Sequence, residues 1–196
     1  VYSDNGVWSS GASRIFSLLS GWGWETEYIS SNQVNSGYLD TSFNLVIFPG
    51  GDAGAYNRDL NSAGESVIRN FVSGGGGYVG ICAGAFWATD RIIWHGNEID
   101  YPLNLIPGTA TGPLEPLCNP GSSCWIDVEY TGDHPACDNV TGSISSYYFD
   151  GPEMDSPGTA VFARYTGLNT PAAVATEYGS GRVAVIGIHP EMSGST

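Results

Sequence analysis

Short apolar runs alternate with amphipathic segments along this 196-residue chain, a pattern typical of an α/β fold. Continuous apolar runs within residues 43–51 and at 78–81 end in or lead to glycine-rich turns, as buried parallel strands do. Apolar residues at helical spacing predict helices within 9–23 and 62–77, and a further helix beginning at residue 83. Strands are also predicted at residues 1–2, 25–30, 92–94, 103–106, 125–130, 143–149, 160–165, 172–178 and 183–188.

The order of these segments indicates one domain over residues 1–196. Neither an internal repeat nor a linker is evident, and the stretch around residues 112–137, which contains the cysteine cluster, is interpreted as an insertion outside the core. No apolar run approaches the roughly 18 residues of a membrane helix, so we expect a soluble protein without a membrane partner.

Charge and composition narrow the possible partners and location. The chain has no lysine, and it contains six arginines and twenty acidic residues, so its net charge is −14. This negative charge argues against nucleic-acid binding. The low charge content, the 28 glycines and the start at Val1 without methionine favour a secreted protein. Asn139 begins an Asn-Val-Thr triplet, a glycosylation acceptor in a polar stretch, although such triplets also occur by chance.

The four cysteines fall into a cluster of three and a single residue. Cys118, Cys124 and Cys137 lie within twenty residues, and the sequence CNPGSSC encloses a Pro-Gly turn that can close a small disulfide loop. We therefore expect one disulfide among these three and one thiol left over, which could pair with Cys82. A metal cluster is the rival interpretation, but there is no C-x-x-C pair and only His134 is nearby, so no metal is predicted.

The stretch GYVGICAGAF places Cys82 between an apolar strand and a predicted helix. This is the strand-turn-helix arrangement of a nucleophile elbow, in which Gly80 and Gly84 avoid collisions at the sharp turn. The helix N-terminus favours a thiolate, and the Ala83 N–H can stabilise an oxyanion. A buried, inert cysteine in a glycine-rich turn is the alternative.

A base and a group to orient it occur near the end of the chain, in VAVIGIHPEM. His189 and Glu191 follow an apolar strand two residues apart, so both side chains can point the same way. Glu191 can then hold one ring nitrogen of His189 while the other faces a thiol. A capping histidine beside a solvent-exposed glutamate is the alternative.

Further candidates lie in loops that follow predicted strands. At the end of the strand within residues 43–51, Gly51 can offer its N–H to an oxyanion. A phosphate-binding loop is discounted because its Lys and Ser/Thr are absent. Asp4 and Asn5 are candidate substrate contacts, since ligands bind at the carboxyl ends of parallel strands. Asp150, in the aromatic-acidic run at residues 147–152, is a further candidate, and Asp52 is a candidate whose role is open. For each of these four, an ordinary turn residue is the alternative.

Taken together, VYSDNGV, FPGGDAGAYNRDL, GGGYVGICAGAF, LNLIPGTATGP and IGIHPE resemble the class I glutamine-amidotransferase-like superfamily, specifically its biotin-protein-ligase N-terminal-domain-like branch. The resemblance implies a doubly wound, mostly parallel flavodoxin-like sheet with helices on both faces. It also implies that Cys82, His189 and Glu191 form a triad and that Gly51 and Ala83 form its oxyanion hole.

Two hypotheses about function follow. The first is a secreted thiol hydrolase or amidase that needs no cofactor and acts on an amide or acyl bond of a small molecule or peptide. The second is a non-catalytic extracellular binding protein on the same scaffold, whose aromatic-rich loops hold a ligand. The oligomeric state is left open.

Overall fold

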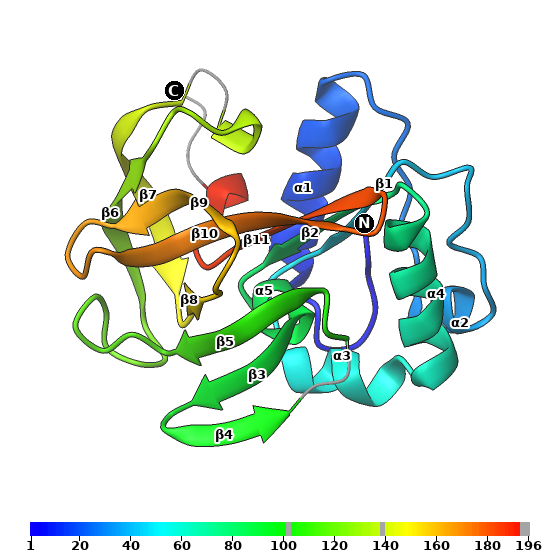
Figure 1. The fold of residues 1–196 in the computed structure, drawn as a ribbon, viewed down its shortest axis with the longest axis horizontal. Helices are drawn as coiled ribbons and strands as arrows, with labels where there is room; N and C mark the ends of the chain where they lie inside the picture. Colours follow the sequence, from blue (N-terminus) through cyan, green and yellow to red (C-terminus); the bar gives the residue numbers. More distant parts are fainter. Residues whose placement is uncertain (101–102, 138–139, 193–196) are drawn as a thin grey trace.

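The computed structural model describes residues 1–100, 103–137 and 140–192 (Figure 1). Its helices are α1 (Ser9–Gly21), α2 (Ser31–Asn35), α3 (Ala53–Asp59), α4 (Ser62–Ser73) and α5 (Ala83–Ala88), with short 3-10 helices η1 (Pro135–Cys137) and η2 (Pro190–Met192). Its strands are β1 (Leu45–Phe48), β2 (Gly77–Ile81), β3 (Thr89–Trp94), β4 (Asn97–Asp100), β5 (Ile106–Gly112), β6 (Ser123–Tyr130), β7 (Gly142–Phe149), β8 (Glu153–Asp155), β9 (Ala160–Tyr165), β10 (Thr170–Tyr178) and β11 (Gly181–Ile186).

The α/β class is confirmed, but the central sheet is mixed rather than mostly parallel. Its seven strands run in the order β1-β2-β11-β10-β9-β6-β7, and β1, β2 and β11 are parallel neighbours. The remaining neighbours are antiparallel, and a tight turn between β10 and β11 allows no other arrangement for that pair. A second sheet, which the sequence did not indicate, has the order β4-β3-β5-β8.

Helices cover both faces of the parallel part of the sheet, as expected. On one face, Ile15 of α1 packs in a cluster with Ile47 and Ile81. On the other face, Ile68 of α4 belongs to the main core with Tyr78 and the side chains of α5. Because successive strand residues point to opposite faces, the apolar runs of β1 and β2 supply both clusters.

Two predicted strands are much reduced. Residues 1–2 and 25–30 contribute an isolated parallel bridge between Tyr2 and Ile29, because the chain turns away directly afterwards. The strand predicted at 103–106 begins instead at Ile106, as β5. Among the described residues, no helix is long and apolar enough to span a membrane.

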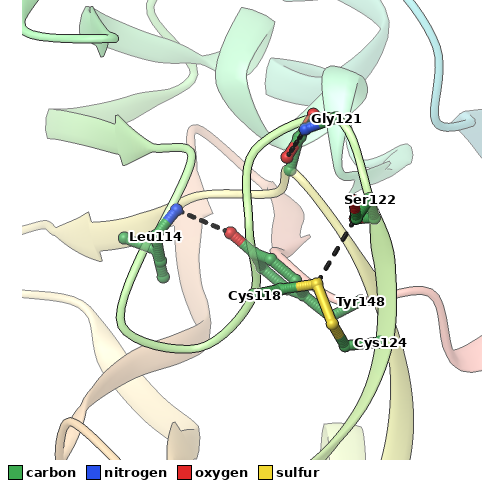
Figure 2. The surroundings of a disulfide bond; sticks show 7 residues. Leu114, Cys118, Gly121, Ser122, Cys124 and Tyr148 are labelled. Atoms are coloured by element: carbon green, nitrogen blue, oxygen red, sulfur yellow. Dashed lines mark hydrogen bonds between the residues drawn. A yellow bond between two sulfur atoms is a disulfide. The ribbon is translucent and has the colours of Figure 1, made fainter.

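The cysteine-rich stretch is tied to the central sheet. A disulfide joins Cys118 to Cys124, as expected for one pair of the three (Figure 2). β6 then continues into the sheet between β7 and β9, so this stretch is more than an excursion from the core. Cys137 and Cys82 are both free thiols, buried in different hydrophobic clusters. The glycosylation candidate Asn139 lies outside the described residues.

Candidate active site

Cys82 occupies a strained turn between β2 and α5. Its φ of 51° and ψ of −102° place a residue with a side chain in a region that such residues rarely adopt. A Cβ on Gly84 would collide with the carbonyl oxygen of Phe48, and one on Gly80 would collide with the backbone of Gly84. The two flanking glycines are therefore required for close packing, and the sharp turn predicted from the sequence is present.

His189 and Glu191 follow β11 and lie on or beside η2. Nδ1 of His189 is 2.8 Å from Oε1 of Glu191, and the two residues are 1% and 3% exposed. The backbone N–H of His189 donates to the carbonyl of Tyr147 at 2.8 Å, and Arg14 Nε donates to the carbonyl of Glu191 at 2.7 Å. The glutamate is therefore buried and paired, which rules out a solvent-exposed residue.

The second ring nitrogen of His189 is available to the thiol. Nε2 is buried, and within the described part of the chain no atom meets hydrogen-bond geometry with it. Burial opposes protonation of the His189 ring and lowers its pKa. Charge and hydrogen-bond interactions with Cys82, and then with Glu191, have the opposite effect and are stronger together. The pKa of His189 is therefore raised to about 10. These interactions favour the protonated form of the imidazole. The Cys82 sulfur lies 3.5 Å from the carbonyl oxygen of Phe149.

A cavity of about 630 Å³ opens over these groups. Of the residues singled out from the sequence, its lining contains Gly51, Asp52, Cys82, Ala83, Asp150 and His189. Glu191 stands behind His189 and does not line it, which suits a residue that orients the imidazole. The structure thus brings together segments more than a hundred residues apart in sequence.

Gly51 and Ala83 line the same cavity as Cys82. Gly51 has a φ of 146° and lies opposite Val7 in an isolated antiparallel bridge. The neighbours of these two residues make the hydrogen bonds of the bridge. Trp8 N–H donates to the Gly50 carbonyl at 2.8 Å, and Asp52 N–H donates to the Gly6 carbonyl at 2.7 Å. Those two bonds leave the N–H of Gly51 itself unused. The role of Gly51 and Ala83 in binding an oxyanion stays a prediction.

The four candidate substrate contacts differ in position. The Asp4 carboxylate accepts hydrogen bonds from the N–H and hydroxyl of Ser31, which lowers its pKa, and neither it nor Asn5 lines the cavity. Asp52 lines the cavity and also caps α3. Asp150 lines it too.

Asp150 links the cavity to the disulfide loop. Its carboxylate oxygens accept from the Gly121 N–H at 3.1 and 2.9 Å, inside the loop closed by Cys118 and Cys124 (Figure 2). Nearby, the Tyr148 hydroxyl accepts from the Leu114 N–H and donates to a backbone carbonyl, both at 2.8 Å. These contacts hold the loop against one side of the cavity.

The apolar lining includes Trp8, which the sequence did not single out. Trp8 contacts His189 edge-on, with ring centroids 5.0 Å apart, and stacks on Tyr147 at 6.0 Å. Its position just before α1 carries no recognisable signal. The remaining apolar residues are Phe86, Ile92, Trp94, Ile99 and Phe149.

The close approach of Gly50 to the imidazole gives a direct test of the site geometry. A Cβ at Gly50 would overlap Cε1 of His189. We expect Gly50→Ala to displace the ring and to slow iodoacetamide alkylation of Cys82 at least about tenfold. The matched control is Gly21→Ala, because a Cβ there meets nothing within 4 Å. An unchanged alkylation rate in a folded Gly50→Ala variant would contradict this geometry.

The comparisons with known proteins agree with this architecture. The chain has a glutamine-amidotransferase-like fold. A solved glutamine amidotransferase superposes with a TM-score of 0.68 at 21% identity, covering 92% of this chain and 86% of that one. The PurLQS structure from Thermotoga maritima gives a TM-score of 0.70 at 17% identity, covering 97% of this chain and 85% of that one. At these identities the likeness shows the fold alone.

The chain belongs to the biotin-protein ligase N-terminal family, whose model matches residues 1–196. A biotin–protein ligase of Schizosaccharomyces pombe is 30% identical over 168 residues, which cover 76% of this chain and 26% of the relative. An uncharacterised protein of Chlamydia muridarum is 35% identical over 74 residues, covering 35% of this chain and 29% of the relative. The chain therefore matches less than a third of the length of either curated relative.

Membership of this family confirms the resemblance and corrects the functional prediction. The expectation of a secreted thiol hydrolase is wrong, because the matching family is the N-terminal part of biotin–protein ligases and the Schizosaccharomyces pombe relative is a biotin–protein ligase. The comparisons give no evidence of secretion, so an extracellular location stays a prediction. The family is enzyme-related, as expected, while the use of a cysteine nucleophile is not established by membership.

Proposed function

We propose that Cys82 carries out acyl transfer on a small molecule, as the thiol-bearing domain of a protein with a biotin–protein-ligase-related function. The observation that carries the proposal is the strained Cys82 in a cavity with the buried His189 imidazole, whose Nε2 has no hydrogen-bond partner among the residues that the structure describes. The printed name of the fission-yeast relative describes the joining of biotin to a protein. Biotin is a carboxylic acid, so its transfer is an acyl transfer.

The first half-reaction forms a thioester on Cys82. The thiolate attacks the acyl carbon of an amide or activated acyl compound, and the carbonyl electron pair moves onto oxygen, where the N–H groups of Gly51 and Ala83 can hold it. When the intermediate collapses, the bond from carbon to the leaving nitrogen or oxygen breaks. His189 gives its Nε2 proton to that leaving group, while Glu191 keeps the ring in place.

The second half-reaction regenerates the thiol site. An acceptor amine attacks the thioester carbon, His189 takes up the proton that the amine loses, and the thiolate leaves. An amine acceptor accords with a function that joins a small molecule to a protein. Because the protonated form of His189 is favoured, it acts first as an acid and then as a base.

Biotin 4-nitrophenyl ester tests this proposal. The expected result is a burst of nitrophenolate close to one equivalent and a biotin adduct on the Cys82 peptide that hydroxylamine removes, as it removes thioesters. Because the chain has no lysine, no lysine side chain competes for the ester. Cys137→Ala is the matched control, since that thiol is also free and buried and should be dispensable.

A burst that persists in Cys82→Ala would contradict the proposal, as would an adduct mapped to Cys137. The iodoacetamide reaction gives an independent measure, with preferential labelling of Cys82 expected near neutral pH. Equal labelling of the two thiols in the folded protein would overturn the assignment of Cys82 as a nucleophile.

A further inference from the structure

An apolar wall, made of Phe86, Ile92, Trp94 and Ile99, forms part of the cavity. Ile92 and Trp94 are two residues apart on β3, so their side chains lie on one face of the strand, and Ile99 on β4 pairs directly with Ile92. Phe86 of α5 contacts Trp94 edge-on, with ring centroids 5.5 Å apart. The four side chains pack in one hydrophobic cluster. The wall is therefore a fixed surface built on two strands and a helix.

Cationic side chains are kept out of the cavity. The chain has no lysine, and none of its six arginines is part of the lining. Arg91 lies on β3 but one residue out of phase with the wall, where it pairs with Glu98 at 3.1 Å. Arg58 pairs with Asp52 at 3.4 Å from an exposed position. The residues Asp52 and Asp150 line the cavity, and their carboxylates accept hydrogen bonds from the N–H groups of Gly54 and Gly121, so the acidic groups of the lining offer a ligand carboxylate no partner.

Among the described lining residues, His189 is the side chain that can carry positive charge, and both of its ring nitrogens already have a partner or a role in the proposed reaction. Its Nδ1 faces the Glu191 carboxylate at 2.8 Å, and its Nε2 is available to Cys82 and to the leaving group. A carboxylate or phosphate carried on the body of a ligand would therefore lose its hydration without gaining a partner. The apolar body of a ligand would lose no hydrogen bonds to water when it packs against the wall, and the burial of its apolar surface would favour binding.

We infer that this site selects acyl compounds whose body is apolar and either uncharged or cationic, and that it discriminates against a ligand with a free carboxylate or phosphate. The inference rests on the proposed function and specifies its substrate class. Amides and esters of an apolar acid belong to this class, whereas the free acid and a zwitterionic amino acid do not. A cavity of about 630 Å³ has room for a compound of this kind.

A matched set of chloroacetamides tests the inference. The probes are chloroacetamide and three N-benzyl derivatives that carry hydrogen, a carboxylate or an aminomethyl group at the para position. The rate of Cys82 alkylation is followed by peptide mass spectrometry and divided by the rate with 2-mercaptoethanol. We expect the benzyl probe to exceed chloroacetamide, and to exceed the carboxylate probe, each by at least about tenfold. The aminomethyl probe should equal or exceed the neutral one.

Two further comparisons separate the cavity from the rest of the molecule. The alkylation rates are compared at low and high salt, because salt screens interactions between charges more than about 10 Å apart. The comparison identifies any long-range repulsion between the carboxylate probe and the net charge of −14. Trp94→Ala and Ile99→Ser should each reduce the advantage of the benzyl probe. Ile93→Ala, on the opposite face of β3, is the matched control and should retain it.

The outcomes distinguish this inference from the proposed function. If chloroacetamide modifies Cys82 but the benzyl group gives no gain, the inference about the apolar wall is wrong and the nucleophile assignment stands. The same holds if the carboxylate probe reacts as fast as the neutral one at high salt. If no probe prefers Cys82 to Cys137, the proposed function itself is overturned, and this inference is overturned with it.

Discussion

Replacing His189 with asparagine is expected to slow alkylation of Cys82 by iodoacetamide on the order of 30-fold near neutral pH. The reason is that an unpaired cysteine is only a few per cent thiolate under these conditions, whereas an adjacent imidazolium favours the reactive thiolate. The imidazolium is favoured in the native protein because Cys82 and Glu191 raise the pKa of His189 to about 10 against the effect of burial. The measurement is the rate of Cys82 modification as a function of pH.

The pH profile distinguishes loss of the ion pair from general damage. In His189→Asn the rate should rise steadily with pH as an isolated thiol ionises, while the native protein should already react quickly near neutrality. His95→Asn is the matched control, because His95 is exposed and does not line the cavity. If the two variants react equally fast near neutral pH, His189 is not the partner of the thiol.

The cysteine turn could be predicted from sequence because its constraints are local. A sharp strand-to-helix turn needs small neighbours, and Gly80 and Gly84 sit at the positions where a Cβ would strike backbone. The pattern of glycine, cysteine and glycine after an apolar run therefore carries most of the information. The left-handed φ of Cys82 follows from that local geometry.

The sequence predicted the contact between His189 and Glu191, but it predicted the wrong backbone conformation for these residues. The sequence suggested two side chains on the same face of an extended strand end. In the structure β11 ends at Ile186, and the short helix η2 places the Glu191 carboxylate against Nδ1. Both arrangements bring residues two apart together, so their spacing alone does not distinguish them.

The apolar wall could not be predicted because it depends on a hairpin that the sequence pattern hides. The strand at Ile92–Trp94 was expected, but its partner was not, since the second strand of the hairpin is short and mostly polar. The turn between them uses His95 and Gly96, both with positive φ, instead of a familiar hairpin pair such as Asn-Gly. The position of Ile99 beside Ile92 therefore becomes clear only in three dimensions.

The candidate contacts Asp4 and Asn5 show a limit of reasoning from topology. The loop after the first strand of a doubly wound sheet is a common ligand-binding position. Here the predicted first strand is only an isolated bridge at Tyr2. The Asp4 carboxylate accepts a hydrogen bond from the hydroxyl of Ser31 at the start of α2. The Asp4 side chain thus stabilises a neighbouring helix start. Rules about loops at sheet edges do not indicate which side chains are already used in this way.

Replacing Cys82 with alanine is expected to move the pKa of His189 down from about 10. Burial opposes the imidazolium, and among the groups that stabilise it, Cys82 contributes before Glu191. Without the thiol, burial is opposed by Glu191 alone, so the ring should lose its proton at a lower pH than in the native protein. The measurement is an NMR titration of histidine-labelled protein, in which His95 and His134 serve as internal references.

The matched control for this titration is Cys137→Ala, which removes the other free, buried thiol and should leave His189 unchanged. Thermal unfolding of both variants checks that the core around α5 is intact. A pKa that stays at its native value in Cys82→Ala would mean that Glu191 alone holds the proton on the ring. The imidazole would then be no more than a structural partner of a buried glutamate. A clear downward shift would tie the protonation of His189 to the thiol, and that coupling is what acyl transfer through Cys82 requires.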